Sequence, residues 1–195
     1  SSAEVRASRL NCWQTKPMVR LRRSASASPS TLPMETPFIA RPPEVGVSTV
    51  YGMFDMFKSA GRDWGMIVDG RPGEPLIVPR VVATSHAAFA AGNGVIIQPD
   101  STFEETAPPD VVCVPELLVA PGEPIDGRFH GEVEFLKRCH ASGSILATAC
   151  SGALLLAEAG LLDGHDATTH WAYCDVMTRR YPRIRVHSQR ALVVS

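Results

Sequence analysis

Short apolar runs alternate with amphipathic segments along most of the chain, a pattern typical of an α/β domain with a mainly parallel sheet. The predicted strands cover residues 38–40, 76–83, 95–97, 110–115, 144–149, 184–187 and 191–194. The predicted helices cover residues 53–60, 127–142, 151–159 and 171–180, and a glycine or proline follows each of them. Such residues end helices, and the short connections between these elements indicate one compact domain.

Two of these elements carry expectations about packing. Pro79 lacks an N–H, so its strand is expected to lie at an edge of the sheet or to bend there. In the helix at 127–142, one stripe holds Phe129, Val133, Leu136 and His140, which we expect to form the buried face.

The first 33 residues differ from the rest in charge and composition. They hold six basic residues and one acid, which gives a net charge of +5, and they are rich in serine. They have no sustained apolar period, so we expect residues 1–36 to be a disordered extension and residues 37–195 to be the folded domain. A flexible extension is favoured over an organelle-targeting peptide, which remains the alternative.

The overall composition excludes several classes of protein. The chain is 45% hydrophobic and 20% charged, with a formal net charge of −1, which offers no general attraction to nucleic acid or membranes. No apolar run is long enough to span a bilayer. The cysteines are odd in number, scattered and without a CxxC pair, which argues against disulfides and zinc: Cys12, Cys113, Cys139, Cys150 and Cys174. We therefore expect reduced thiols, a cytoplasmic location, and neither metal nor cofactor.

The strongest local signal is the stretch from Ile145 to Leu156, ILATACSGALLL, in which an apolar strand runs into an apolar helix with almost no loop. Cys150 stands at the joint among small residues, the layout of a nucleophile elbow. The free N–H groups and positive dipole of the following helix favour the thiolate form. The alternative is a small apolar core residue, the interpretation we keep for the other cysteines on predicted strands and helices.

A histidine follows twenty residues later, in the segment ATTHW. His170 could lie beside Cys150 if its strand neighbours the elbow strand, and a Cys–His pair is the minimum for nucleophilic catalysis. A single histidine is otherwise more often structural.

Several motifs together resemble the ThiJ/PfpI family of class I glutamine amidotransferase-like domains. They are ACSGA, LAEAGLLDG, ATTHW and Tyr181-Pro182, and the chain is most similar to the N-terminal domain of GlxA-type, AraC-family transcriptional regulators. The resemblance covers roughly residues 38–195 and implies a flavodoxin-like three-layer α/β sandwich that forms a homodimer. It also implies that Cys150 is the elbow residue, that His170 is its nearby histidine, and that Ser151 and Gly152 line the site.

Two positions depart from the family pattern. Catalytic relatives carry an acid just before the first helix, and the matching position here is Thr49, with no acid nearby in the sequence. Relatives also have a glycine pair that helps to form an oxyanion hole, where this chain has Glu116 and Leu117. A carboxylate there opposes the stabilisation of negative charge, so both departures argue against efficient acyl transfer or hydration.

The resemblance leaves three functions open. The first is a sensory domain of a transcriptional regulator that binds an unidentified small ligand near Cys150. The second is a cysteine-dependent enzyme, similar to an isonitrile hydratase, an amidase or a glyoxalase, and the third is a redox-responsive chaperone-like protein. Relatives continue past the position of Val194 with a further strand and helix and then two helix-turn-helix units. The resemblance therefore implies an incomplete domain, whose regulator would contact DNA only through a C-terminal region absent from these 195 residues.

Overall fold

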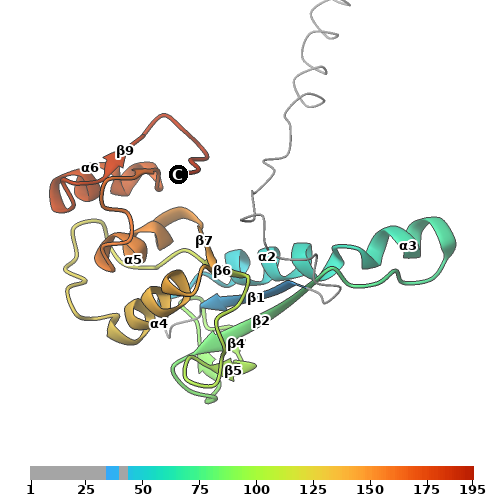
Figure 1. The fold of residues 1–195 in the computed structure, drawn as a ribbon. Helices are drawn as coiled ribbons and strands as arrows, with labels where there is room; N and C mark the ends of the chain where they lie inside the picture. Colours follow the sequence, from blue (N-terminus) through green and yellow to red (C-terminus); the bar gives the residue numbers. More distant parts are fainter. Residues whose placement is uncertain (1–33, 40–43) are drawn as a thin grey trace, which may run out of the picture. The chain divides into compact units, whose positions relative to one another are not determined.

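The computed structural model describes residues 34–39 and 44–195, which are built around a five-stranded sheet (Figure 1). The strand order is β5–β2–β1–β6–β7, and all four pairings are parallel. The strands are β1 (Met34–Ile39), β2 (Ile77–Ala83), β5 (Ser101–Thr102), β6 (Val111–Val114) and β7 (Ile145–Thr148). The predicted parallel α/β architecture is therefore confirmed.

Helices and two small sheets complete the described part of the chain. The helices are α2 (Val47–Ser59), α3 (Arg62–Asp69), α4 (His130–Ala141), α5 (Ala153–Glu158) and α6 (Trp171–Arg180), with a 3₁₀ turn at Cys150–Gly152 before α5. An antiparallel pair joins β3 (Phe89–Ala90) to β4 (Ile96–Ile97), and a parallel pair joins β8 (Asp166–Ala167) to β9 (Arg185–Val186). Gly143 and Gly160 adopt positive φ angles just past α4 and α5, as expected of C-terminal glycines.

The central sheet separates two apolar clusters, which makes the fold a three-layer sandwich. Val112 and Val114 of β6 belong to the cluster that contains α4 and α5, whereas Cys113 between them belongs to the cluster beneath α2. Successive side chains of a strand point to opposite faces, so one short strand contributes to both layers. Phe38 at the centre of the α2 layer is fully buried.

At Pro79, β2 lies at a local edge of the sheet, as the sequence predicted. Pro79 is opposite Thr36 of β1 on one side, while β5 pairs with β2 only at Val82 and Ala83 on the other. At Pro79 the second side of β2 therefore has no described partner strand, which suits a residue that cannot donate a hydrogen bond.

The first strand begins within the segment that we expected to be an extension. β1 starts at Met34, whereas the extension was expected to reach residue 36. Residues 1–33 of that extension, and Ala40 of the predicted first strand, lie outside the described part of the chain.

Helix boundaries differ from the sequence prediction in several places. α2 begins at Val47 rather than Met53, and a separate helix, α3, follows Gly61 where we expected the helical region to end. In α4 the predicted buried stripe is wrong at His140, which is exposed, while Cys139 is fully buried. The helix starts three residues later than predicted, and its inward face follows residues 132, 135–136 and 139.

The sheet edge at β7 also departs from expectation. Three of the four β7 residues are exposed, although the apolar run predicted a strand buried on both faces. The strand predicted at 191–194 does not form: Leu192 is 76% exposed and Val194 is 62% exposed. A strand needs a partner to satisfy its backbone and cover its side chains, and an apolar sequence alone does not supply one.

Candidate functional site

A sharp turn at Cys150 connects β7 to the helices that follow. Ala149 is extended, with φ −114° and ψ 139°, and Cys150 has φ +54°. Cys150 is the single non-glycine residue with a positive φ angle in the part of the chain that the structure describes. This conformation is disfavoured for residues with a Cβ, and such strain concentrates at functional sites. Cys150 is half-buried, whereas Cys113, Cys139 and Cys174 are buried.

The turn is held against the end of β6 by its next two residues. The Ser151 hydroxyl donates to the Leu117 carbonyl at 2.8 Å and accepts from the Leu117 N–H at 2.9 Å, all within the interior. Gly152 approaches so closely that a Cβ on it would lie 2.4 Å from the Pro115 carbonyl oxygen and 2.6 Å from that of Val114. Only glycine permits this contact between the 3₁₀ turn and the strand end.

Glu116 lies between two residues that contact the Cys150 turn: Pro115 lies against Gly152, and Leu117 is hydrogen-bonded to Ser151. The side chain of Glu116 extends towards Gly46, where a Cβ would lie 1.9 Å from the Glu116 Oε1 atom. Gly46 is the N-cap of α2, a helix whose first turn holds no acid and whose cap residue makes no side-chain hydrogen bond. A carboxylate at this helix end is favoured by the helix dipole.

This arrangement corrects one expectation about the site. Thr49 lies in the first turn of α2 rather than before the helix, because α2 begins earlier than predicted, and the start of α2 has an acid nearby in space. The carboxylate comes from Glu116, which is sixty-seven positions later in the sequence. Sequence inspection around Thr49 could not find it, because the two segments meet through long-range backbone pairing, with Val45 opposite Leu117 in an antiparallel bridge.

Thr169, rather than His170, contacts the turn directly. The Thr169 hydroxyl donates to the Cys150 carbonyl at 2.9 Å. His170 is exposed and caps α6, where its Nδ1 accepts from the Ala172 N–H at 3.3 Å. β8, which precedes this segment, pairs with β9 and not with β7, so the strand adjacency that we considered is wrong. The role of His170 as a partner for the thiol therefore stays a prediction.

Tyr173 is a residue of this site that sequence reasoning missed. Its hydroxyl donates to the Val119 carbonyl, and its ring lies edge-on to His170 at 6.1 Å. Burial, and next the negative charge of a Cys150 thiolate, raise the pKa of the Tyr173 hydroxyl above its ordinary value. A signal was present in the sequence, since Tyr173 follows His170 by three positions and so shares its side of α6.

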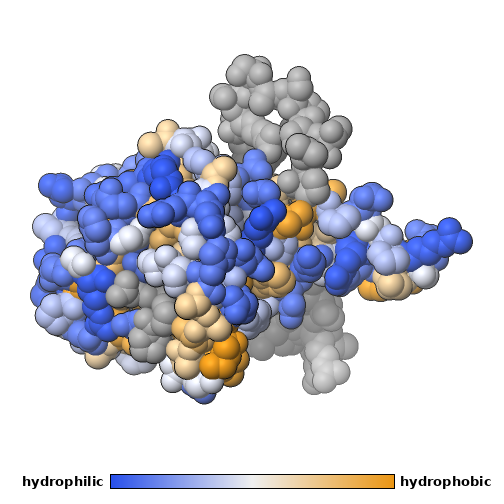
Figure 2. All heavy atoms as spheres, turned by 90° about the horizontal axis from the view of Figure 1, so that it is seen from below, coloured by the Kyte–Doolittle hydropathy of each residue, from blue (hydrophilic) through white to orange (hydrophobic). Residues whose placement is uncertain are grey.

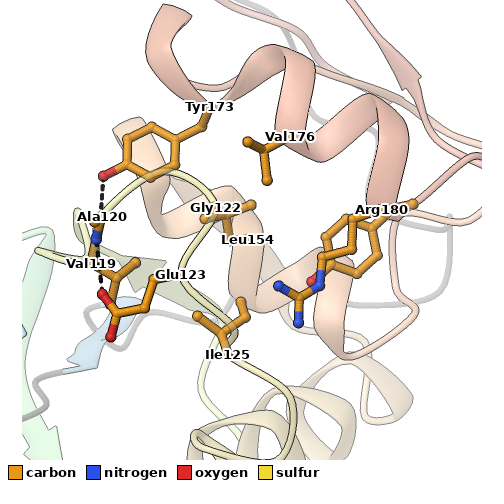
Figure 3. A pocket seen from close by; sticks show the side chains of 10 residues that line it. Val119, Ala120, Gly122, Glu123, Ile125, Leu154, Tyr173, Val176 and Arg180 are labelled. Atoms are coloured by element: carbon orange, nitrogen blue, oxygen red, sulfur yellow. Dashed lines mark hydrogen bonds between the residues drawn. The ribbon is translucent and has the colours of Figure 1, made fainter.

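A small pocket opens beside Tyr173 (Figure 3). Its apolar walls come from Val119, Ile125, Leu154 and Val176, with Tyr173 on one side and Arg180 across from it. Cys150 is not among the residues that line it. Because Arg180 is already paired with Asp126, the pocket offers an apolar surface next to the Cys150 turn rather than an anion site over it.

Two further features of the described residues bear on chemistry. Nowhere in residues 34–39 and 44–195 do three His, Cys, Asp or Glu side chains come together in a way that could hold a metal ion. Within the same residues, each helix is too short or too polar to cross a bilayer.

Comparison with known proteins gives one family and two kinds of relative. The profile of the DJ-1/PfpI family matches residues 77–193. Isonitrile hydratase from Pseudomonas putida is 35% identical over 89 residues, covering 45% of this chain and 37% of the relative. The HTH-type transcriptional regulator CdhR from Pseudomonas aeruginosa is 32% identical over 106 residues, covering 54% of this chain and 30% of the relative. The matches thus span about a third of each relative's length.

Solved structures with this fold include regulators and other members of the same family. A ThiJ/PfpI family protein from Pseudomonas syringae aligns with a TM-score of 0.66 and 21% identity, covering 93% of this chain and 67% of that one. An AraC family transcriptional regulator from Pseudomonas putida aligns with a TM-score of 0.62 and 16% identity, covering 83% and 80%. At these identities the likeness establishes the fold alone.

Proposed function

Because the chain belongs to the DJ-1/PfpI family, we propose that its domain senses a small ligand beside Cys150 as part of an AraC-type transcriptional regulator. The similarity to regulators such as CdhR supports the class of protein. In this proposal the domain acts in the cytoplasm as a homodimer. DNA contact belongs to a helix-turn-helix region outside residues 37–195.

The observation that carries the proposal is the position of Glu116. Its backbone is held against the Cys150 turn on both sides, through Pro115 at Gly152 and through Leu117 at Ser151. Acyl transfer and hydration through a cysteine build negative charge on an oxygen beside the sulfur. A carboxylate next to that position repels such charge, while it leaves binding of a neutral or cationic ligand unhindered.

The second candidate is a cysteine-dependent hydratase or hydrolase that uses Cys150 as its nucleophile. The similarity to an isonitrile hydratase favours it, as does the strained backbone at Cys150. In this case Cys150, with His170 as the acid–base partner, would add water to a small polarised substrate.

Alkylation of the four described cysteines tests whether the site exists. Iodoacetamide at pH 8 is expected to modify Cys150 at least tenfold faster than Cys113, whose thiol pKa burial raises to about 12. Peptide mass mapping measures both rates in one sample. Equal rates at the two residues would remove the basis of both candidate functions.

Charge selectivity tests the role of Glu116. The ratio of modification by anionic iodoacetate to that by neutral iodoacetamide should rise at least threefold in Glu116→Gln, because the repelling carboxylate is gone. Glu134→Gln, an exposed substitution on α4, is the matched control and should leave the ratio unchanged. An unchanged ratio in both variants would show that Glu116 does not face the sulfur.

Turnover separates the two candidates. The sensing proposal expects small molecules that raise the unfolding temperature and protect Cys150 from iodoacetamide without being consumed. Hydration of an isonitrile to a formamide by the wild-type chain, lost in Cys150→Ser, would establish the enzyme instead.

A further inference from the structure

The positive φ angle of Cys150 is the feature of this domain that ordinary packing does not require. On the face seen in Figure 2, hydrophilic residues predominate and apolar residues form small separate patches, which are common on folded domains and indicate no binding surface by themselves. A φ angle of +54° at a residue with a Cβ is different, because this backbone is disfavoured and persists only where the surroundings hold it. The contacts that hold Cys150 therefore bear on what its thiol can do.

Hydrogen bonds hold the backbone on both sides of Cys150. Before it, the Ala149 N–H donates to the Val114 carbonyl at 2.9 Å, which fixes the end of β7 against β6. After it, the Gly152 N–H donates to the Ala149 carbonyl, also at 2.9 Å, and closes the 3₁₀ turn. Neither bond uses the Cys150 carbonyl, which accepts from the Thr169 hydroxyl at 2.9 Å. The carbonyl of the strained residue is thus held by a side chain that lies 19 positions later in the sequence.

The bond from Thr169 sets the direction of the peptide between Cys150 and Ser151. A trans peptide is planar, and its carbonyl and N–H point in opposite directions. Because the Cys150 carbonyl points at Thr169, the Ser151 N–H points away from Thr169. This N–H lies in the first turn of the helical segment that begins at Cys150, where N–H groups have no partner within the helix. Such a donor stabilises an anionic atom beside the turn, and a thiolate is one.

Thr169 is itself tied to the start of helix α6. It directly precedes His170, the N-cap of α6, and its own carbonyl oxygen lies 3.8 Å from the sulfur of the buried Cys174. The hydroxyl that holds Cys150 is thus carried next to a helix end that packs into the fold. The Cys174 sulfur also gives a chemical probe of this contact, because it becomes accessible only if the start of α6 moves away.

We propose that Thr169 is a positioning residue of the Cys150 site: its hydroxyl holds the Cys150–Ser151 peptide in the orientation that makes the thiol reactive. The assignment rests on the reactive Cys150 of the function proposed above. It applies equally to a sensing domain and to an enzyme, because both use the same turn. Thr169 acts through the backbone of Cys150, so its own hydroxyl need not touch a ligand.

Alkylation of Cys150 in threonine variants of the full chain tests this role. With iodoacetamide at pH 8, Thr169→Val should slow the modification of Cys150 about three- to tenfold, which is the effect of losing one ordinary hydrogen bond. Thr169→Ser keeps the hydroxyl and should stay within about twofold of wild type. Thr178→Val is the matched control, because the Thr178 hydroxyl also donates to a cysteine carbonyl at 2.9 Å, that of Cys174. Its loss should leave the rate at Cys150 unchanged.

The buried cysteines distinguish positioning from a general loosening of the fold. Peptide mass mapping of the same samples gives the alkylation rates at Cys174, beside Thr169, and at Cys113 in β6. Both rates should stay within about twofold of wild type in Thr169→Val, because the fold remains closed. A rise at Cys174 would show that the substitution detaches the start of α6, and Thr169 would then have only a structural role.

The outcomes also separate this inference from the proposed function. A wild-type Cys150 that reacts no faster than Cys113 would overturn both. A reactive Cys150 whose rate is as high in Thr169→Val as in wild type would overturn only the role of Thr169. Equal slowing in Thr169→Ser and Thr169→Val would overturn it as well, because the hydroxyl would then not be the group that matters.

Discussion

Replacement of Gly152 by alanine should destabilise the fold through a clash between backbone and a single methyl group. The new Cβ would meet the carbonyl oxygens of Pro115 and Val114 at 2.4 and 2.6 Å, where ordinary contacts begin at 3.4 Å. Both oxygens would have to move by about 0.8–1 Å, and over-packing of this kind costs roughly 1–3 kcal/mol. Gly152 has φ −57°, so alanine suffers no backbone strain and gains up to about 1 kcal/mol of helix propensity.

The steric cost should exceed the gain, because the clashing atoms belong to the end of β6 and cannot rotate away as a side chain would. We expect a net loss of about 1–2 kcal/mol, which lowers the unfolding temperature by roughly 2–8 °C in a domain of this size. Gly52→Ala is the matched control: Gly52 lies within α2 and has no atom within 4 Å of its added Cβ.

Thermal unfolding followed by circular dichroism measures both variants in parallel. Gly52→Ala should unfold about 2–4 °C above wild type, since only the helix propensity changes. If Gly152→Ala unfolded at or above the wild-type temperature, the close contact between the 3₁₀ turn and β6 would be wrong. The packing argument for the Cys150 turn would then be lost with it.

Two further substitutions test hydrogen bonds and charges that hold the site. Ser151→Ala should reduce the free energy of unfolding in urea by about 2 kcal/mol, because it leaves the Leu117 N–H and carbonyl without their buried partner, and a loss below about 0.5 kcal/mol would contradict this. Asp166→Asn should lower the unfolding temperature at pH 7, because the Arg185 and then the His187 side chains hold the pKa of Asp166 well below its usual range. A lowered folded-state pKa stabilises the fold above the unfolded value of about 4, so the difference from wild type should be complete at pH 6 and shrink as the pH falls below about 4. A difference that grew towards pH 3 would refute this sign.

Local sequence was sufficient for the elements and for the turn. The run from Ile145 to Leu156 predicted a strand that enters a helix at Cys150, and the structure places a positive φ angle there. The small residues around Cys150 were part of the predicted turn, and at Gly152 the end of β6 leaves no room for a Cβ. Periodicity and glycine placement act over a few residues, so they can be read without knowing the fold.

The residues that surround the turn were decided by tertiary structure. Glu116 was assigned to the site from the resemblance, but its contact with Gly46 at the start of α2 depends on the long-range bridge between Val45 and Leu117. Thr169 reaches the Cys150 carbonyl although β8, the strand that precedes it, pairs with β9 and not with β7. Strand order is a long-range property, and no local pattern in the sequence specifies it.

The features of the protein surface also divide into those that local sequence predicted and those that depend on the tertiary structure. The apolar run at 191–194 predicted a strand, whereas the helix at 62–69 was not predicted from the sequence. Only the tertiary structure decided that Gly65 faces the loop after α3, that Trp64, Ile67 and Val68 face solvent, and that 191–194 has no described partner. A hydrophobic pattern states which side chains gain from burial, whereas the packing of the whole chain decides which of them are buried.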